Sequence, residues 1–317
     1  MPRNSITLTE HILKEEQKFP KASGNLTLLL TQIAEAGKII ASHVQNSGLI
    51  DIEGKTGKKN VYEEEVKKLD EFANDTMVRV LTESKQVFAL ASEEIEKPFF
   101  TEITKADYVV FFDPLDGSNN VDNNNPLGTI FSIYRKGDSL LQKGKEQVAA
   151  GYIFYGSSVM FVYSCGSGVN GFTLDPSVGS FLLSHKNITI PEQGSIYGVN
   201  EGNFNLFEKP TQEFILSLKK SKPYRLRWGA CMVADVHRFL MNGGVFMYPK
   251  DKSAPNGKLR LMFEVNPMAY IITKAGGMAL TTTENPLEIN PSELHQRTPV
   301  LLGSPHEVKN FLKFHKK

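Results

Sequence analysis

The stretch Phe111-Phe112-Asp113-Pro114-Leu115-Asp116-Gly117-Ser118 decides how the fold is interpreted, because it joins a buried strand to two acids and a turn. The aromatic and β-branched run over residues 108–112 predicts a strand buried on both faces, whose C-terminal end delivers the two aspartates into a loop. Gly117 allows the backbone to approach a ligand closely, and a helix after it would direct free N–H groups at an anion. These features predict a site for a metal-bound phosphate. A solvated Asx turn is the alternative for these eight residues alone.

Acidic residues also follow two other predicted strands. Glu93 and Glu94 come after the apolar segment 87–91. Because neighbouring strand residues face opposite sides, one can point into a site while the other meets a second cation, a water or a lysine. Glu264 ends the predicted strand 259–265, and each acid alone could be a solvated strand-end residue. Together they would repel one another unless divalent cations lay among them, and carboxylate oxygens select Mg²⁺, Mn²⁺ or Ca²⁺. The chemistry indicated is metal-assisted attack of water on a phosphoryl group.

Length and composition narrow the classes of partner. The 317 residues suffice for two domains. The 36 basic and 35 acidic side chains nearly cancel, which argues against an electrostatic binder of nucleic acid or membrane. Two cysteines, Cys165 and Cys231, lie far apart without metal-site spacing, which indicates a reducing compartment. The N-terminus lacks an apolar signal segment and no stretch is long enough to span a bilayer, so we expect a cytoplasmic protein.

Hydrophobic periodicity predicts an α/β fold, with layers of sheets and helices in two parts, residues 1–187 and 188–317. Helices are expected at 26–44, 63–82, 211–221, 232–242 and 267–275, with the last ended by Gly276 and Gly277. Strands are expected within 87–183 and at 244–248 and 259–265, and a loop at 47–60. His237 is interpreted as a structural side chain, because no second histidine stands at metal-site spacing.

A family resemblance becomes visible at this point. Asp113 to Ser118 resembles the metal-binding signature of the lithium-sensitive sugar phosphatases. The wider context resembles class I fructose-1,6-bisphosphatase, in order, at residues 61–70, 91–94, 109–119, 128–135, 149–152, 197–202, 232–238, 255–277 and 295–305. The resemblance implies the sugar-phosphatase fold and hydrolysis of the 1-phosphate of fructose 1,6-bisphosphate in gluconeogenesis. It also implies two to three Mg²⁺ ions per subunit, with Mn²⁺ as a substitute, in a homotetramer. Sedoheptulose 1,7-bisphosphatase, or an enzyme acting on both bisphosphates, remains an alternative.

The resemblance also assigns roles to individual residues. The metal ligands would be Glu93, Asp113, Asp116, Glu264 and the Leu115 carbonyl, with Glu64 at a third cation site where the family usually has aspartate. Asp70 and Glu94, beside Glu93, would carry out catalysis by positioning and deprotonating water. The amides of Gly117 and Ser118 would hold the 1-phosphate.

A second phosphate-binding group is expected in the C-terminal part. Asn200, Arg227, Tyr248 and Lys258 supply an amide, a guanidinium, a phenol and an ammonium, which suit the distal phosphate and the sugar hydroxyls. The resemblance implies that Arg227 reaches into a neighbouring subunit's site. The chain departs from the family pattern at Asn203 and Trp228, where better-known members carry tyrosines.

The N-terminal part carries a possible effector site. In the animal enzymes AMP binds a set of residues whose counterparts here are Gly24, Thr27, Tyr108 and Arg135. Asp107 stands where those enzymes have a lysine, so we expect weak inhibition by AMP or none. The cysteine-bearing insertion of chloroplast forms is missing between residues 135 and 149, which argues against thioredoxin control.

Overall fold

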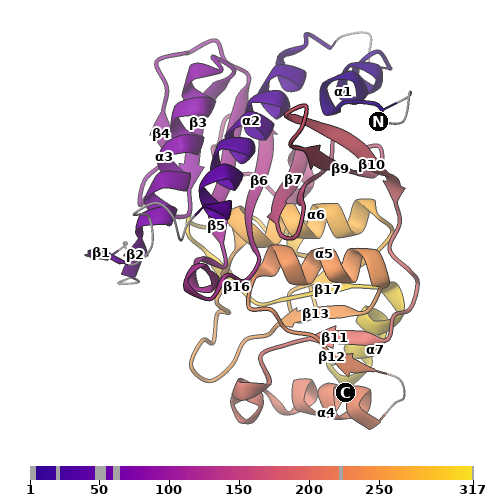
Figure 1. Ribbon diagram of the computed structural model, residues 1–317. Coiled ribbons are helices and arrows are strands. Elements are labelled where there is room, and N and C mark those ends of the chain that lie inside the picture. The colour runs from indigo at the N-terminus through magenta and orange to yellow at the C-terminus, as the bar shows by residue number, and fades with distance from the viewer. Residues whose placement is uncertain (1–4, 19–21, 47–54, 60–64, 221–223, 316–317) are drawn as a thin grey trace.

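Helices and sheets alternate through the molecule in layers (Figure 1). The computed structural model describes residues 5–18, 22–46, 55–59, 65–220 and 224–315. The largest sheet has eight strands in the order β10-β9-β8-β7-β6-β5-β3-β4. Its strands are β3 (Val87–Ser92), β4 (Phe99–Phe100), β5 (Tyr108–Asp116), β6 (Leu127–Arg135), β7 (Gln147–Tyr155), β8 (Val159–Ser164), β9 (Val169–Asp175) and β10 (Ser180–Ile188).

Apolar residues on both faces of this sheet explain its central position. Every side chain of β5 is buried, and in β6 only the last residue is exposed. Such strands need cover on two sides. One face packs against α1 (Leu8–Glu16), α2 (Asn25–Gln45) and α3 (Lys68–Glu83), and the other against α5 (Met232–Asn242) and α6 (Asn266–Lys274).

A second, five-stranded sheet lies beyond α5 and α6, in the order β12-β11-β13-β17-β15 (Figure 1). Its strands are β11 (Ile196–Gly198), β12 (Arg225–Leu226), β13 (Val245–Tyr248), β15 (Met278–Leu280) and β17 (Val300–Gly303). The helices α4 (Lys209–Lys220) and α7 (Pro305–His315) cover its outer face. Two small sheets pair β1 (Lys55–Lys59) with β2 (Glu65–Lys67), and β14 (Leu259–Arg260) with β16 (Arg297–Thr298). None of the helices described here combines the length and the apolar character needed to cross a bilayer.

Most predicted helices are confirmed within a few residues. The period over 26–44 corresponds to α2, and the one over 232–242 coincides with α5. α6 ends where the glycine pair was expected to cap it. Gly276 has φ +88°, and the Gly277 N–H donates to the Ile272 carbonyl at 2.8 Å. His237 is structural as expected, because its Nδ1 lies 2.9 Å from the Tyr152 hydroxyl oxygen.

Four local predictions are wrong, and each fails where tertiary contacts override the local pattern. The helix expected from residue 63 begins at Lys68, because residues 65–67 pair with β1 instead. That pairing also places a strand at 55–59 inside the expected loop. The remainder of that loop, 47–54 and 60, lies outside the described residues, and so does Glu64.

The other two corrections concern the predicted site. The strand expected to end before Asp113 continues as β5 to Asp116. The strand expected over 259–265 stops after Arg260, and Leu261–Val265 form a π-helical turn closed by the Asn266 N–H and the Leu261 carbonyl. All five side chains of this turn are buried. Because a segment buried on every side has no alternation of apolar and polar residues, its hydrophobic periodicity cannot distinguish a strand from a helix.

Candidate active site

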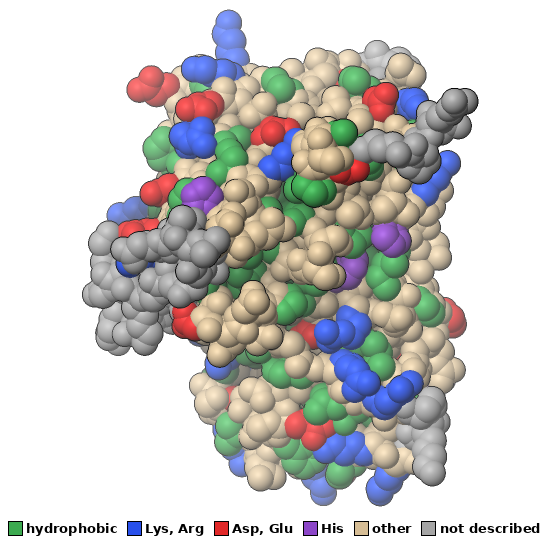
Figure 2. All heavy atoms as spheres, viewed as in Figure 1, with side chains coloured by type: hydrophobic (Ala, Val, Ile, Leu, Met, Phe, Trp, Pro, Cys, Tyr) green, Lys and Arg blue, Asp and Glu red, His purple; other side chains and the backbone are tan. Residues whose placement is uncertain are grey.

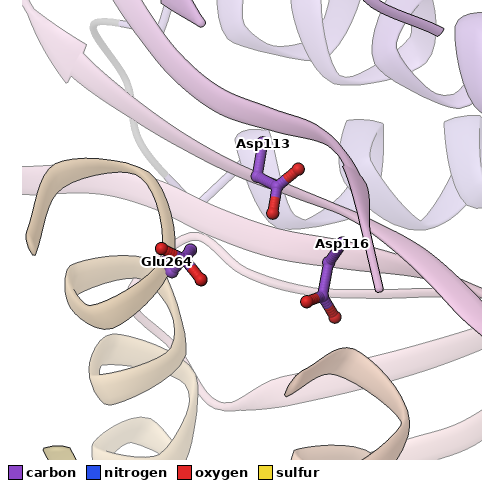
Figure 3. A group of neighbouring side chains, drawn as sticks. All are labelled: Asp113, Asp116 and Glu264. Atoms are coloured by element: carbon purple, nitrogen blue, oxygen red, sulfur yellow. The ribbon is translucent and has the colours of Figure 1, made fainter. Parts of the chain in front are cut away.

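Three buried carboxylates from distant parts of the sequence converge between the two sheets (Figure 3). Asp113 and Asp116 come from β5, and Glu264 comes from the π-helical turn before α6. One oxygen from each lies within 4.8 Å of the others. We call these three residues the carboxylate cluster.

A bulge in β5 brings the two aspartates to one side. Residues three apart in a regular strand face opposite ways. Here Asp113 pairs with Ile130 and Asp116 with Gly128, so β5 contains one extra residue relative to β6 between these two pairs. This extra residue is a β-bulge. Pro114, which has no N–H to donate, occupies the irregular segment, and its carbonyl accepts from the Thr129 hydroxyl at 2.8 Å. The two aspartates of Asp-Pro-Leu-Asp therefore reach the same site only because the strand contains this bulge.

Burial and mutual repulsion raise the pKa of every member of the carboxylate cluster. Desolvation is the largest cause for each. The pKa of Asp113 lies well above its usual range, and the nearby Glu93 charge raises it further. Burial raises the pKa of Asp116 to about 6 although backbone and thiol donors oppose the shift. A divalent cation among these oxygens would remove the repulsion, so the donor set fits a hard cation.

Arg260 links the carboxylate cluster to Glu93, the first residue after β3. Its backbone N–H donates to Glu264 Oε2 at 2.6 Å, and its guanidinium Nη1 forms an ion pair with Glu93 Oε1. Glu93 and Glu94 both border the same cavity. Glu93 lies outside the group of three closest carboxylates.

The cavity beside the cluster has a volume of about 210 Å³. Nine of the residues predicted for the site line this cavity, namely Glu93, Glu94, Asp113, Leu115, Asp116, Gly117, Ser118, Tyr248 and Glu264. Gly117 has φ +79°, and a short 3₁₀ helix, Ser118–Asn123, follows it. Trp228 also borders the cavity and stacks on Phe246 with ring centroids 5.8 Å apart. The cavity therefore combines acids, a glycine turn and an aromatic wall.

Four other predicted residues lie outside this lining in the part of the chain that the structure describes. Asp70 is buried in the first turn of α3. Asn200 is exposed and caps the 3₁₀ helix Glu201–Leu206, and Lys258 is exposed. Arg227 is exposed, and its Nη1 donates to the Leu226 carbonyl at 2.8 Å.

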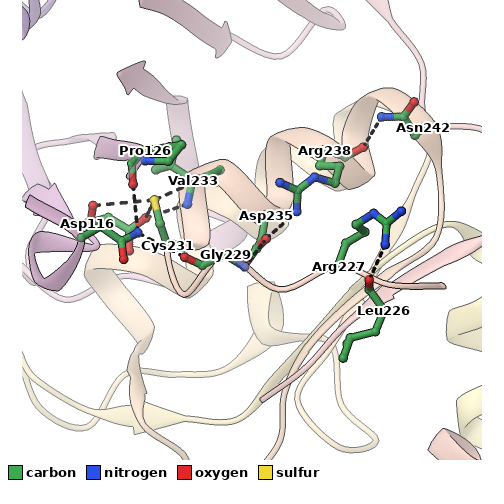
Figure 4. Close-up of polar contacts among 12 residues, drawn as sticks. Asp116, Pro126, Leu226, Arg227, Gly229, Cys231, Val233, Asp235, Arg238 and Asn242 are labelled. Carbon is green, nitrogen blue, oxygen red and sulfur yellow. Dashed lines mark hydrogen bonds and ion pairs between the residues drawn. The ribbon is translucent and has the colours of Figure 1, made fainter. Parts of the chain in front are cut away.

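The position of Arg227 contrasts with that of its neighbour. Trp228 borders the cavity, whereas Figure 4 shows Arg227 on the far side of the loop from Asp116. Basic side chains gather over β12 and α5 on the face seen in Figure 2. Asn203 does not replace the missing tyrosine in the cavity, and its amide donates to Asp251 Oδ2 at 3.1 Å.

Two residues of the site, Cys231 and Arg260, were not predicted from the sequence. Cys231 borders the cavity and contacts Asp116. It directly precedes the predicted helix 232–242, and that position could have been noticed as an N-cap. Arg260 lay in the alternating basic and apolar pattern before Glu264, where it was interpreted only as part of a strand.

The possible effector residues surround a separate cavity of about 740 Å³. Gly24, Thr27, Tyr108 and Arg135 all border it, and the Arg135 guanidinium lies 5.5 Å from the Tyr108 ring centroid. The carboxylate of Glu16 occupies the start of α2. It accepts from the Gly24 N–H at 2.5 Å and from the Thr27 hydroxyl. The Glu16 carboxylate thus already accepts the hydrogen bonds that Gly24 and Thr27 would otherwise donate to a bound anion.

Comparison with known proteins decides the family. A family model described as "Fructose-1-6-bisphosphatase, N-terminal domain" matches residues 6–186, and "Fructose-1-6-bisphosphatase, C-terminal domain" matches residues 190–316. The chain belongs to the fructose-1,6-bisphosphatase family. Membership implies dependence on a divalent metal ion, which agrees with the carboxylate cluster.

Individual relatives extend over the whole chain. Fructose-1,6-bisphosphatase class 1 of Persephonella marina is 51% identical and covers 99% of both chains. The class 1 protein of Sulfurihydrogenibium sp. is 50% identical over 98% of this chain and 97% of its own. Among solved structures, Leishmania major fructose-1,6-bisphosphatase in holo form has a TM-score of 0.94 at 39% identity, covering 99% of this chain and 100% of that one. The layered fold expected from the sequence is the fold of this family.

Proposed function

We propose that this chain hydrolyses the 1-phosphate of fructose 1,6-bisphosphate, giving fructose 6-phosphate and inorganic phosphate, in gluconeogenesis. The observation that carries the proposal is the buried carboxylate cluster beside the Gly117 turn, in a chain of this family. Relatives about half identical over their full length are named for this activity, and they support the choice of substrate.

The first role proposed for the chain's own residues is to hold cations. Asp113, Asp116 and Glu264, with Glu93 and the Leu115 carbonyl, would bind two Mg²⁺ or Mn²⁺ ions, and Glu64 a third. These ions would polarise the phosphoryl group and neutralise the charge that develops on it. Because burial raises the pKa of the cluster, cations and protons would compete for the same oxygens.

The second role is to place the reacting phosphate and to move a proton. Gly117 has φ +79° and borders the cavity at the start of the 3₁₀ helix, where the amides of Gly117 and Ser118 would hold the phosphate. Glu94 borders the cavity, and with Asp70 it would orient the attacking water and take its proton.

The third role is to bind the distal phosphate. Tyr248 borders the cavity, and Asn200 and Lys258 would complete the group from exposed positions. Arg227 is exposed and does not line the cavity of its own chain, which supports its proposed reach into a neighbouring subunit of a homotetramer. We also propose a boundary between domains at 187/188, which the limits of the two family matches support, and a cytoplasmic location, which the two free cysteines support.

Turnover of the purified protein on three substrates tests the proposal. Fructose 1,6-bisphosphate should be hydrolysed with the highest kcat/KM, and inositol 1-phosphate, which lacks a distal phosphate, should be hydrolysed poorly. Sedoheptulose 1,7-bisphosphate decides the alternative, because equal turnover would indicate an enzyme for both bisphosphates. A preference for inositol 1-phosphate would contradict the proposal.

A further inference from the structure

The thiol of Cys231 contacts one member of the carboxylate cluster from the side of the second sheet (Figure 4). Its Sγ lies 3.1 Å from Asp116 Oδ2, and the Val233 N–H donates to the same oxygen at 2.6 Å. Both donors belong to the N-terminal end of α5. Because both donors meet one oxygen, they fix the position of that oxygen relative to this helix.

The loop that presents Cys231 is itself held on two sides. The Gly229 N–H donates to both carboxylate oxygens of the fully buried Asp235, at 3.0 and 2.9 Å. The Asn120 amide, from the 3₁₀ helix after β5, donates to the Gly229 carbonyl at 3.1 Å. The loop is thus tied to α5 and to the strand that carries Asp116.

Close packing leaves the thiol little freedom. Ala230, just before it, has φ +54°, a backbone conformation that costs a non-glycine residue of order 1 kcal/mol and persists only where the surroundings hold it. A Cβ on Gly117 would lie 2.7 Å from Cys231 Cβ, so the thiol packs directly on the turn after Asp116. Cys231 is 2% exposed, so its thiol is held in the packed interior beside the carboxylate.

We infer that Cys231 is a positioning residue, whose thiol donates to Asp116 Oδ2 and thereby holds that carboxylate in the orientation needed to bind a divalent cation with Asp113 and Glu264. The inference deepens the proposed function and rests on it. The role requires a short side chain that ends in a hydrogen-bond donor. A serine side chain meets this requirement, and its hydroxyl is a stronger donor than a thiol. Alanine would leave Oδ2 with the backbone donors alone.

Direct binding of Mn²⁺ to the full-length protein, followed by electron paramagnetic resonance, tests this role without using activity. Cys231→Ala should weaken Mn²⁺ binding about tenfold, the lower end of the effect seen when a partner of a metal ligand is removed. Cys231→Ser should restore an affinity close to that of the original protein. Cys165→Ala is the matched control, because this second cysteine borders the other cavity and should leave Mn²⁺ affinity unchanged.

Unchanged Mn²⁺ affinity in a folded Cys231→Ala protein would overturn the inference, and so would equal weakening in the serine and alanine variants. If the alanine variant does not fold, Cys231→Gly replaces it, because glycine is tolerated at an N-cap and also lacks the donor. Failure of the original protein to bind Mn²⁺ would instead overturn the proposed function, so the two failures are distinguishable.

Discussion

Arg260 forms an ion pair with Glu93 at the edge of the carboxylate cluster, and both side chains are largely withdrawn from solvent. The same residue's backbone N–H holds Glu264. A guanidinium among several acids offsets part of their repulsion before any cation binds, since an unpaired buried charge is costly. Arg260 therefore contributes to the stability of the metal-free protein.

Replacing this arginine should have an effect that depends on divalent cations. Arg260→Gln should lower the free energy of unfolding by about 3 kcal/mol in chelator, the amount typical of breaking a buried pair, and by less in Mg²⁺. Urea unfolding with and without Mg²⁺ measures both values. Arg79→Gln, in the exposed pair Arg79–Glu83, is the control and should change stability by under about 1 kcal/mol. A loss of equal size in both conditions would show that Arg260 acts independently of the cation site.

Removing Arg227 should impair substrate binding more than turnover. Under the proposal that Arg227 binds the distal phosphate, Arg227→Ala would remove one charge-assisted contact worth about 1.5–3 kcal/mol, so KM should rise roughly tenfold or more. Arg225→Ala, an exposed arginine two positions earlier on β12, is the matched control. Steady-state kinetics on fructose 1,6-bisphosphate give both constants. An unchanged KM would mean that the distal phosphate binds elsewhere.

AMP should inhibit weakly or not at all. The carboxylate of Glu16 already engages Gly24 and Thr27, and Asp107 adds a second negative charge beside Tyr108. Glu16→Ala should strengthen inhibition by AMP, whereas Glu15→Ala, which removes an acid from the same cavity but not from the start of α2, should not. AMP titrations at saturating Mg²⁺ compare the three proteins. Tight, cooperative inhibition of the original protein would contradict the expectation.

His237 should make the protein sensitive to acid. Burial lowers its pKa from 6.5 to about 4, with smaller contributions from His185 and Arg238. Since the unfolded chain then binds the proton first, the stability contributed by neutral His237 is present above about pH 6.5 and is lost as the pH falls toward about 4. The full loss is about 3 kcal/mol.

Thermal or urea unfolding between pH 4 and pH 7 measures this dependence. The carboxylate cluster, whose pKa values are raised, contributes a slope of the opposite sign in both proteins, so the test is the difference between them. Relative to the original protein, His237→Gln should lose less stability as the pH falls, although it starts from a lower stability because the contact with Tyr152 changes. The exposed His306 provides the control, and His306→Gln should leave the slope unaltered. An identical pH dependence in the original protein and in His237→Gln would contradict a role for His237.

The layered fold and most of the cavity could be predicted from the sequence, because amphipathic helices and fully apolar strands are local patterns. The period of α2 and the buried run of β5 follow directly from residue order. The aspartates, the glutamate pair and Glu264 could be named because several hard oxygen ligands in one chain suggest one site. The number of acidic residues at the ends of predicted strands, more than the spacing between any two of them, indicated a metal site.

The parts that could not be predicted depend on contacts between distant segments. The bulge that turns Asp116 to the side of Asp113 is defined by the pairing of β5 with β6. The π-helical turn that presents Glu264 is buried on every side, so it has no local signature. Cys231 meets Asp116 across 115 positions of the sequence, and no pattern near either residue indicates that contact.

The central claim is tested most directly by phosphate release from fructose 1,6-bisphosphate in Mg²⁺ and in excess chelator, with Asp116→Ala beside the original protein. The account predicts activity in Mg²⁺ that disappears in chelator and returns when Mg²⁺ or Mn²⁺ is restored, and an Asp116→Ala protein that is folded but inactive under every condition. Full activity in chelator, or an active Asp116→Ala variant, would contradict it.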